Sequence, residues 1–385
     1  MPAHENAPTT LRVGLIGLGF IGRIHAQAYH AIPFALQNPQ AQARLQAILR
    51  RHSGGDEPFL TSLGNPRVLT DAEEFFSQDL DMVDVCTPNH LHFAQVMAAL
   101  AKGLPVYCEK PLSANLEQAR QMADAAECAG LPTHMAFNMR YYPAVQQARA
   151  ILASGALGEV YNFRAYLFHN SYMDAARPTS WRLQKDASGG GALTDLGVHM
   201  LDLLRYLLGE YSWVQCRTRT FIPSRPAAPG SDAMVPVDVD DWALCTLGMR
   251  SSATGSLEVT RMSGGVTDTE RVQIFASQGS LEIDFNNPLQ VMYYDARRQQ
   301  TLSGAGDFSM PANQPHLGDI YPPAKLSMGL FIDSHFACIM DFLTSLRSGR
   351  PCPPDFADGF KAQEILAAAY LSAANAGATV NLPIE

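Results

Sequence analysis

The sequence lacks the patterns of a secreted, metal-ribbon or membrane protein. Its seven cysteines are odd in number and widely spaced, and none forms a C-x-x-C pair, which is typical of reduced core cysteines. The N-terminus has neither a basic nor an apolar signal segment, and the first apolar run, residues 11–16, is too short to cross a bilayer. These absences predict a cytoplasmic protein that does not bind membranes.

An excess of positive charge is also missing. Lys and Arg total 28 against 37 Asp and Glu, so the formal net charge is −9, and no block of like charge concentrates it. Nucleic acid and anionic lipid are therefore excluded as expected partners. With 385 residues, 47% of them hydrophobic and 17% charged, the chain is long enough for two domains with substantial cores.

The first third of the chain alternates short apolar runs with helical stretches. The expected strands are residues 11–16, 45–49, 82–86, 105–108 and 132–137, and convincing helices lie at 93–101 and 116–128. Nearly continuous apolar strands separated by helices predict a parallel sheet covered on both faces. We therefore expect an α/β fold with an N-terminal Rossmann dinucleotide-binding domain over residues 1–136.

The pattern changes in the second half. Beyond about residue 210, β-branched alternation predicts antiparallel strands, and two helices close the chain. The strands are expected at residues 238–249, 256–260, 271–276 and 280–285, and the helices at 332–348 and 358–376. Residues 137–385 are thus predicted to form an α+β domain for substrate binding and oligomerisation, with the boundary near Phe137.

A glycine-rich turn follows the first strand and opens a helix. It reads Gly17-Leu18-Gly19-Phe20-Ile21-Gly22. The first glycine permits the tight turn, the second lets backbone approach a pyrophosphate, and the third allows close packing of helix on sheet. A turn that is merely rich in glycine is the alternative. In this strand–turn–helix context the motif predicts dinucleotide binding.

The end of the second strand bears on the choice between NAD and NADP. An acidic residue there would bind the ribose 2′-hydroxyl of NAD, but this chain has Arg50 and Arg51. A guanidinium fork suits a 2′-phosphate, so these residues favour NADP over NAD. Two surface arginines without a cofactor role are the alternative.

Two further loops follow strands of the predicted parallel sheet. Residues 87–92 come directly after the strand 82–86, at the edge where open parallel sheets bind ligands. Solvated or capping histidines are the alternative interpretation of His90 and His92. One strand later, Lys110 stands between Glu109 and a proline at the same edge, which argues against a loose surface charge.

A third cluster begins with three glycines, residues 189–191. Asp195 and His199 follow at i and i+4, so on a helix they share one face. A histidine beside a carboxylate is a general acid–base unit, and the glycines suggest close approach to a ligand. Zinc is the rival, but the pair supplies two ligands where a catalytic site needs three, so no metal is expected. A salt bridge between Asp195 and His199 on the helix surface, without a catalytic role, is the alternative.

Taken in order, these motifs resemble the Gfo/Idh/MocA oxidoreductases, the glucose–fructose oxidoreductase and inositol dehydrogenase group, over nearly the whole chain. The matching segments are residues 17–22, 87–90, 109–111, 138–143, 181–182 and 189–199. The resemblance implies an open antiparallel sheet in the second half, often used for dimerisation. A homodimer or homotetramer through that sheet is therefore expected.

The resemblance also implies roles for individual residues. It makes Lys110, Asp195 and His199 the catalytic group, with Asp195 and His199 also contacting substrate. It places around the nucleotide Thr87, Asn89, His92, Glu109, Lys110, Trp181 and Arg182, in addition to the glycine loop and the two arginines. It implies that Asn138 and Arg140 begin the substrate domain in the sequence and contact substrate. Tyr166 and His169, between the first strand of that domain and Trp181, are candidate substrate contacts, with surface polar residues as the alternative.

The implied reaction is hydride transfer between a nicotinamide and a secondary hydroxyl or keto carbon of a sugar, cyclitol or related polyol. His199 would move the hydroxyl proton, Lys110 would stabilise the developing alkoxide, and Asp195 would orient the imidazole. Two other functions remain open. Some relatives cleave glycosides with a bound nicotinamide, and others are inactive sensors of nucleotide or sugar. The intact Lys110, Asp195 and His199 argue against the sensor.

Overall fold

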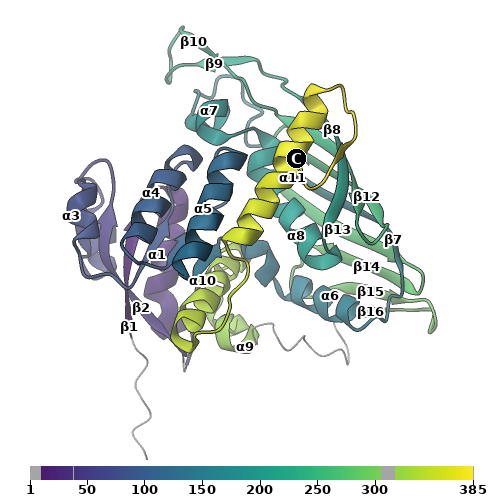
Figure 1. Cartoon of the computed structure of the whole chain (residues 1–385), viewed down its shortest axis with the longest axis horizontal. Helices are drawn as coiled ribbons and strands as arrows, with labels where there is room; N and C mark the ends of the chain where they lie inside the picture. The colour runs from purple at the N-terminus through teal and green to yellow at the C-terminus, as the bar shows by residue number, and fades with distance from the viewer. Residues whose placement is uncertain (1–9, 38, 305–316, 385) are drawn as a thin grey trace, which may run out of the picture. The chain divides into compact units, whose positions relative to one another are not determined.

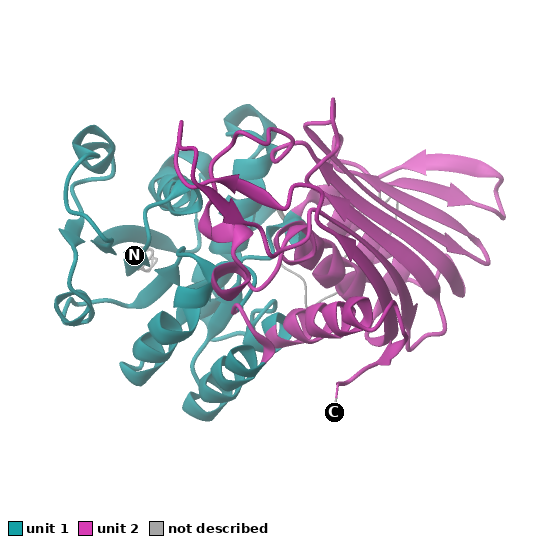
Figure 2. Cartoon of the chain, turned by 90° about the horizontal axis from the view of Figure 1, so that it is seen from above, with its two compact units in different colours: residues 1–112, 117–141, 315–359 teal, residues 113–116, 142–314, 360–385 magenta. Residues whose placement is uncertain are grey.

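The computed structural model describes residues 10–37, 39–304 and 317–384, and Figure 1 shows the course of the chain. The chain divides into two compact units, drawn in two colours in Figure 2. Unit 1 comprises residues 1–112, 117–141 and 315–359, and unit 2 comprises residues 113–116, 142–314 and 360–385. Unit 1 thus takes up a segment from late in the chain, which a single boundary near Phe137 does not include.

Unit 1 is built on a parallel sheet, as the sequence predicted. Within the described ranges, six strands pair in the order β3-β2-β1-β4-β5-β6. They are β1 Thr10–Ile16, β2 Gln42–Leu49, β3 Arg67–Leu69, β4 Met82–Val85, β5 Val106–Cys108 and β6 Thr133–Met135. The strand order reverses between β1 and β4, and ligands of such sheets bind at that switch point, beyond the carboxyl ends of the strands. The Rossmann prediction is confirmed; the short strand β3 was missed.

Helices complete unit 1. They are α1 Phe20–Ala35, α2 Glu57–Ser62, α3 Ala72–Phe76, α4 Asn89–Ala101, α5 Leu116–Ala129, η1 Asn138–Tyr141, α9 Leu317–Ile320, η4 Ala324–Leu326 and α10 Leu330–Ser348. One core cluster joins Tyr29 and Ile32 of α1 to Phe336, Ile339 and Phe342 of α10. Burying such side chains contributes roughly 1.5–3 kcal/mol each, which accounts for the attachment of α10 to this unit.

Unit 2 is built on a mainly antiparallel sheet, which confirms the second fold prediction. In the part of the chain that is described, its strands lie in the order β16-β15-β14-β13-β7-β12-β11-β8-β17, and only β7 and β12 pair in parallel. They are β7 Val160–His169, β8 Tyr211–Arg219, β11 Trp242–Met249, β12 Thr254–Thr260, β13 Asp268–Ala276, β14 Gly279–Asp284, β15 Met292–Asp295, β16 Gln300–Ser303 and β17 Val380–Asn381. A separate ribbon pairs β9 Ser224–Pro226 with β10 Met234–Pro236.

The remaining helices are α6 Pro143–Ala153, η2 Trp181–Leu183, α7 Lys185–Ser188, the π-helix η3 Leu193–Gly197, α8 Val198–Leu208 and α11 Phe356–Ala374. Along β7, Phe163, Ala165 and Leu167 are buried, whereas Arg164 between them is exposed, as the two-residue period of a strand requires. The other face carries polar and apolar groups, including Leu244 and Tyr294. Self-association through this sheet stays a prediction.

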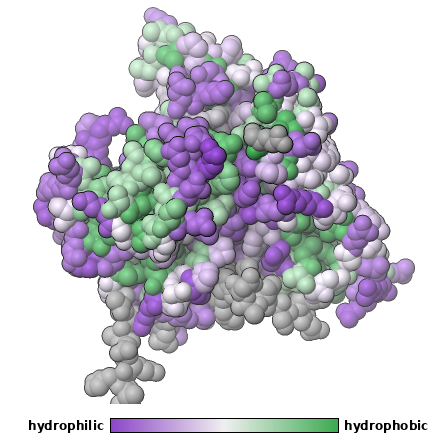
Figure 3. All heavy atoms as spheres, viewed as in Figure 1, coloured by the Kyte–Doolittle hydropathy of each residue, from purple (hydrophilic) through white to green (hydrophobic). Residues whose placement is uncertain are grey.

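Hydropathy varies over one face of the molecule, drawn in Figure 3, where hydrophilic and hydrophobic residues are interspersed. Within the described residues, none of the helices combines the length and apolar character that a bilayer crossing needs.

Candidate active site

The glycine loop joins β1 to α1, and among its three motif glycines only Gly19 has open space around it. Gly17 has φ +96°, and a Cβ there would meet the Cys86 carbonyl oxygen at 2.8 Å. A Cβ on Gly22 would lie 2.1 Å from the Gly17 oxygen, so both glycines are required by the turn itself. A Cβ on Gly19, by contrast, would meet nothing within 4 Å. Open space at the N-cap of a 16-residue helix without acidic side chains in its first turn suits a pyrophosphate.

Replacing Gly19 with valine should therefore leave the fold intact and weaken NAD binding. The side chain would fill the space over the helix N-terminus, and losing charge-assisted hydrogen bonds there costs on the order of 2 kcal/mol, well over tenfold in Kd. Titration calorimetry with NAD, with the melting temperature of the unliganded protein as a fold check, measures this. Gly264→Val, at an exposed glycine of unit 2 with ordinary φ, is the matched control. Unchanged NAD affinity in Gly19→Val would remove the glycine loop from the cofactor site.

Arg50 follows β2 and is occupied within the protein. Its guanidinium forms an ion pair with Asp56 and donates to the backbone carbonyls of Ser53 and Gly54 at 2.8 and 3.2 Å. Asp56 also pairs with Arg23 of α1, and the hydrogen bond from Arg50 leads the effects that lower the pKa of Asp56. Arg51 is exposed. The Asp56 carboxylate therefore already pairs with Arg50, the residue predicted to bind the 2′-phosphate of NADP.

The loop after β4 is held by its own side chains. His92 is fully buried, and its two ring nitrogens lie 3.0 Å from the Pro111 carbonyl oxygen and 2.9 Å from that of Thr87. Burial lowers the pKa of His92, which keeps the ring neutral. Thr87 donates to Gln95 at 2.6 Å, and Asn89 is buried at the start of α4. Both ring nitrogens of His92 thus lie against backbone carbonyl oxygens of the two loops, and its expected place around the nucleotide stays a prediction.

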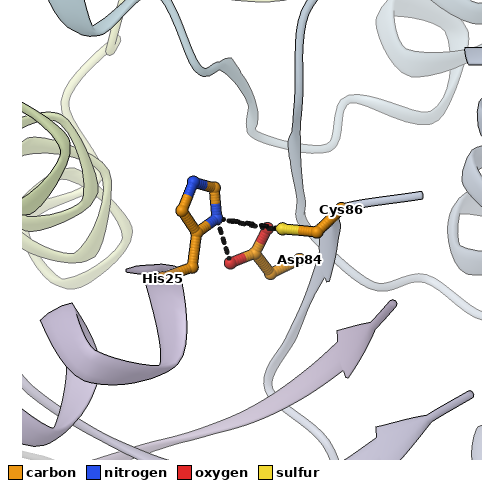
Figure 4. Close-up of side chains that lie close together, drawn as sticks. All are labelled: His25, Asp84 and Cys86. Atoms are coloured by element: carbon orange, nitrogen blue, oxygen red, sulfur yellow. Dashed lines mark hydrogen bonds and ion pairs between the residues drawn. The ribbon is translucent and has the colours of Figure 1, made fainter. Parts of the chain in front are cut away.

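Glu109 connects the Lys110 backbone to a charged cluster inside unit 1. The Lys110 backbone N–H donates to Oε2 of Glu109 at 3.0 Å, and Oε1 of Glu109 lies 3.2 Å from Nε2 of His25. His25 Nδ1 faces Asp84 Oδ2 at 2.9 Å and Cys86 Sγ at 3.1 Å, as Figure 4 shows. His25 and Asp84 are fully buried and Glu109 is 6% exposed.

The charges in this cluster are set by mutual attraction. Burial disfavours a charged histidine, but the interactions with Cys86 and Asp84 outweigh it and raise the pKa of His25 well above its usual value. Burial likewise opposes ionisation of Glu109, yet the ion pair with His25 lowers the pKa of Glu109 to about 2. Burial lowers the pKa of neighbouring His335 to about 3, so that ring is neutral. An imidazolium therefore lies between two carboxyl groups.

The same side chains resemble a metal site in their spacing. His25, Asp84 and Cys86, and also His25, Glu109 and His335, bring potential ligand atoms within 4.8 Å of one another. Donors already engage Asp84, however: the hydroxyl of Tyr29 at 2.9 Å and the thiol of Cys86 at 3.3 Å. These contacts are those of an ion-pair cluster. The absence of a metal stays a prediction.

In unit 2, the three glycines pack against protein and not around an open site. A Cβ on Gly191 would lie 1.8 Å from the Asp240 carbonyl oxygen, and one on Gly189 would lie 2.4 Å from that of Ala114. The Asp240 carboxylate accepts from the backbone N–H of Gly191 and of Leu193, each at 2.9 Å, and from the Tyr370 hydroxyl at 2.7 Å. The expected close approach to a ligand is thus an approach to Asp240.

Asp195 lies on the π-helix that precedes α8. Its Oδ2 accepts from Nη2 of Arg261 at 3.0 Å, and Arg261 is 1% exposed and lies over the Tyr172 ring at 4.7 Å. His199 is in the first turn of α8. Wider π-helical turns recur at functional sites because they re-aim side chains. The plain α-helical spacing expected for Asp195 and His199 was wrong, and Arg261 carried no signal in the sequence.

The other predicted residues lie in both units. Asn138 and Arg140 are buried at the end of a unit 1 segment, where Asn138 donates to Ser334 at 2.9 Å and Arg140 pairs with Asp358 at 3.5 Å. In unit 2, the Arg182 guanidinium lies over the Trp181 ring at 4.3 Å. Tyr166 and His169 are on β7 itself and not after it, and His169 lies 3.7 Å from Asp268. Their roles toward substrate stay predictions.

A parallel sheet whose first strand leads through a glycine-rich turn into a helix is typical of dinucleotide-binding domains. Residues 11–137 match the oxidoreductase family with the NAD-binding Rossmann fold, and residues 145–282 match the GFO/IDH/MocA C-terminal domain. The chain belongs to the Gfo/Idh/MocA family of oxidoreductases, as the sequence motifs predicted.

Individual relatives are sugar dehydrogenases. The chain is 32% identical over 372 residues to levoglucosan dehydrogenase of Pseudarthrobacter phenanthrenivorans, covering 91% of this chain and 93% of that one. D-glucoside 3-dehydrogenase of Escherichia coli is 32% identical over 202 residues, 52% of this chain and 54% of its own. A solved complex of levoglucosan dehydrogenase with NADH and levoglucosan superposes with a TM-score of 0.88 at 31% identity, covering 97% of this chain and 100% of that one.

Proposed function

We propose that this protein is an NAD-dependent dehydrogenase that oxidises a secondary ring hydroxyl of a pyranose sugar or glycoside. The observation that carries the proposal is the full-length similarity to levoglucosan dehydrogenase, together with the open space over Gly19 at the N-terminus of α1. Two other relatives are named for oxidation at carbon 3 of glucose derivatives, so that carbon is the first to test. Bound NAD supplies the acceptor for the hydride.

The chain's own residues then handle the oxygen and its proton. In this proposal Lys110, at the end of β5, donates to the reacting oxygen and stabilises its developing negative charge. His199 takes the hydroxyl proton on oxidation and returns it on reduction. Asp195, held by the buried Arg261, orients the imidazole and accepts from a neighbouring sugar hydroxyl.

A substrate panel tests the activity directly. The purified protein should reduce NAD, followed by absorbance, with levoglucosan, glucose 6-phosphate and simple glucosides offered in turn, and NADP run in parallel. We expect turnover with at least one pyranose. Release of phenol from aryl glycosides without net NADH formation would instead indicate the glycoside-cleaving activity, and binding without any turnover would indicate a sensor.

The cofactor preference is also a proposal, and it departs from the NADP prediction made from Arg50 and Arg51. Asp56 forms ion pairs with both Arg50 and Arg23, so a 2′-phosphate there would meet a carboxylate and two guanidinium groups that already share it. We propose that Asp56 takes the place of the acidic residue missing from the end of β2 and favours NAD.

Replacing Asp56 with alanine should shift the preference toward NADP. Two arginines would then be released for the 2′-phosphate, and charge-assisted hydrogen bonds of this kind change affinity about tenfold or more. The ratio of kcat/KM for NADP to that for NAD measures the shift. Glu57→Ala, which removes the adjacent carboxylate, is the matched control and should leave the ratio unchanged. A wild-type protein that already prefers NADP would contradict the proposal.

A further inference from the structure

The buried cluster of unit 1 forms a continuous chain of contacts from helix α1 to the backbone of Lys110. Asp84 accepts from His25, His25 faces Glu109, and Glu109 accepts from the Lys110 N–H, with distances of 2.9, 3.2 and 3.0 Å. His25 stands one turn after Gly22 in the helix whose N-terminus bears the open position at Gly19. The phosphate-binding helix and the lysine turn therefore share one buried support.

The stability of a hydrophobic core does not require buried charged groups such as these. Removing charged groups from water is costly, and well-packed apolar side chains at the same positions would serve stability at least as well. Several elements face His25: Tyr29 of the same helix bonds Asp84, and Cys86 follows β4. The rings of Tyr107 of β5 and His335 of α10 lie 5.4 and 5.5 Å from that of His25. His25 lies within ion-pair distance of both Asp84 and Glu109, so its removal would take away the group that joins the two carboxyl groups.

We propose that His25 is a positioning residue for Lys110, acting through Glu109. The imidazolium holds Glu109 in place, and Glu109 in turn holds the Lys110 backbone so that its side chain leaves the sheet edge in a fixed direction. This inference rests on the proposed role of Lys110 toward the reacting oxygen. Groups that contact a transition state must be held within a fraction of an ångström, so loosening the support lowers kcat more than it weakens binding.

The kinetic test replaces His25 with glutamine, which retains a polar group of similar reach without the charge. We expect kcat to fall at least tenfold, with KM for the sugar and Kd for NAD within threefold of wild type. His30→Gln makes the same exchange at an exposed position of the same helix and is the matched control. A purely structural role would lower the melting temperature and the active fraction without this split between kcat and KM.

A second measurement does not depend on activity, and its first part uses only the wild-type protein. The chain has only five lysines, so ¹⁵N-lysine labelling yields five backbone amide signals, and Lys110→Arg identifies the one from residue 110. The Lys110 amide of the wild-type protein should exchange with solvent slowly, because it donates to a buried carboxylate. In His25→Gln its signal should shift while the other four stay in place, and in His30→Gln all five should stay.

The outcomes separate this inference from the proposed function. Two results would overturn the positioning role of His25: a wild-type kcat in a folded His25→Gln variant, or rapid exchange of the Lys110 amide in the wild-type protein. If Lys110→Ala is inactive in the same experiments, the proposed catalytic role of Lys110 still stands. Full activity in Lys110→Ala would overturn both. The positioning role of His25 would also be overturned if the purified protein held stoichiometric zinc that His25→Gln lacked. In that case a metal ion, and not an imidazolium, would join the two carboxylates.

Discussion

Lys110→Ala is expected to lower kcat by roughly 10²–10⁴-fold, the range for removing one group that acts on the transition state. The lysine would stabilise negative charge that develops on the substrate oxygen only as the reaction proceeds, so substrate and cofactor affinities should change little. His199→Ala should lose a similar factor, because it moves the proton of the same oxygen. Steady-state kinetics with the sugar found in the panel, and titration with NAD, measure both effects.

The two variants also test whether these residues act as one unit. Their combination should cost less than the product of the single effects, because neither group contributes fully without the other. Lys102→Ala, at the C-cap of α4, removes a lysine from the same unit and should be neutral. Full activity in His199→Ala would show that another group moves the proton, and Asp195 and His169 would be the next residues to replace.

The second large effect concerns the substrate. A deoxy analogue that lacks a hydroxyl next to the reacting carbon should be a poorer substrate by as much as ~10⁴-fold in kcat/KM. Asp195, His199 and Lys110 supply both donors and acceptors, and a site built to bond sugar hydroxyls leaves its own polar groups unpaired when a hydroxyl is absent. Rates of the parent sugar and of its deoxy analogues at each position measure the discrimination.

An apolar ketone provides the opposing control. Reduction of cyclohexanone with kcat/KM comparable to that of the keto sugar would contradict the polyol assignment while leaving the dehydrogenase assignment standing. A loss confined to one deoxy position would locate the hydroxyl that these polar side chains bind. A flat response across all positions would mean that the sugar is held by groups other than Asp195 and His199.

The architecture of both units was predictable because its signals are local. Nearly continuous apolar strands, the glycine turn at residues 17–22 and the alternation beyond residue 210 each arise from how neighbouring residues share a strand or turn. Strand β3 was missed because three residues are too few for periodicity. The return of α10 to unit 1 was missed because it depends on packing of Phe336 and Phe342 against Tyr29 and Ile32, which lie far earlier in the chain.

The candidate site was predictable in part for the same reason. Lys110 and the glycine loop are placed by the ends of strands, and strand ends can be read from the sequence. Asp56, Asp240 and Arg261 were not found, since nothing in their neighbours marks them. Each gains its importance from a partner brought close by the fold: Arg50 for Asp56, the backbone of Gly191 for Asp240, and Asp195 for Arg261.

The sequence by itself determined the family and the two fold classes, and it placed the candidate residues at the ends of β1, β4 and β5. Tertiary structure decided what those residues face: whether an arginine remains open to phosphate or is neutralised by Asp56, and whether a glycine lies against a ligand or against Asp240. Backbone freedom and strand periodicity depend on adjacent residues, whereas the free energy of a charge depends on every group within a few ångströms, wherever in the chain it originates.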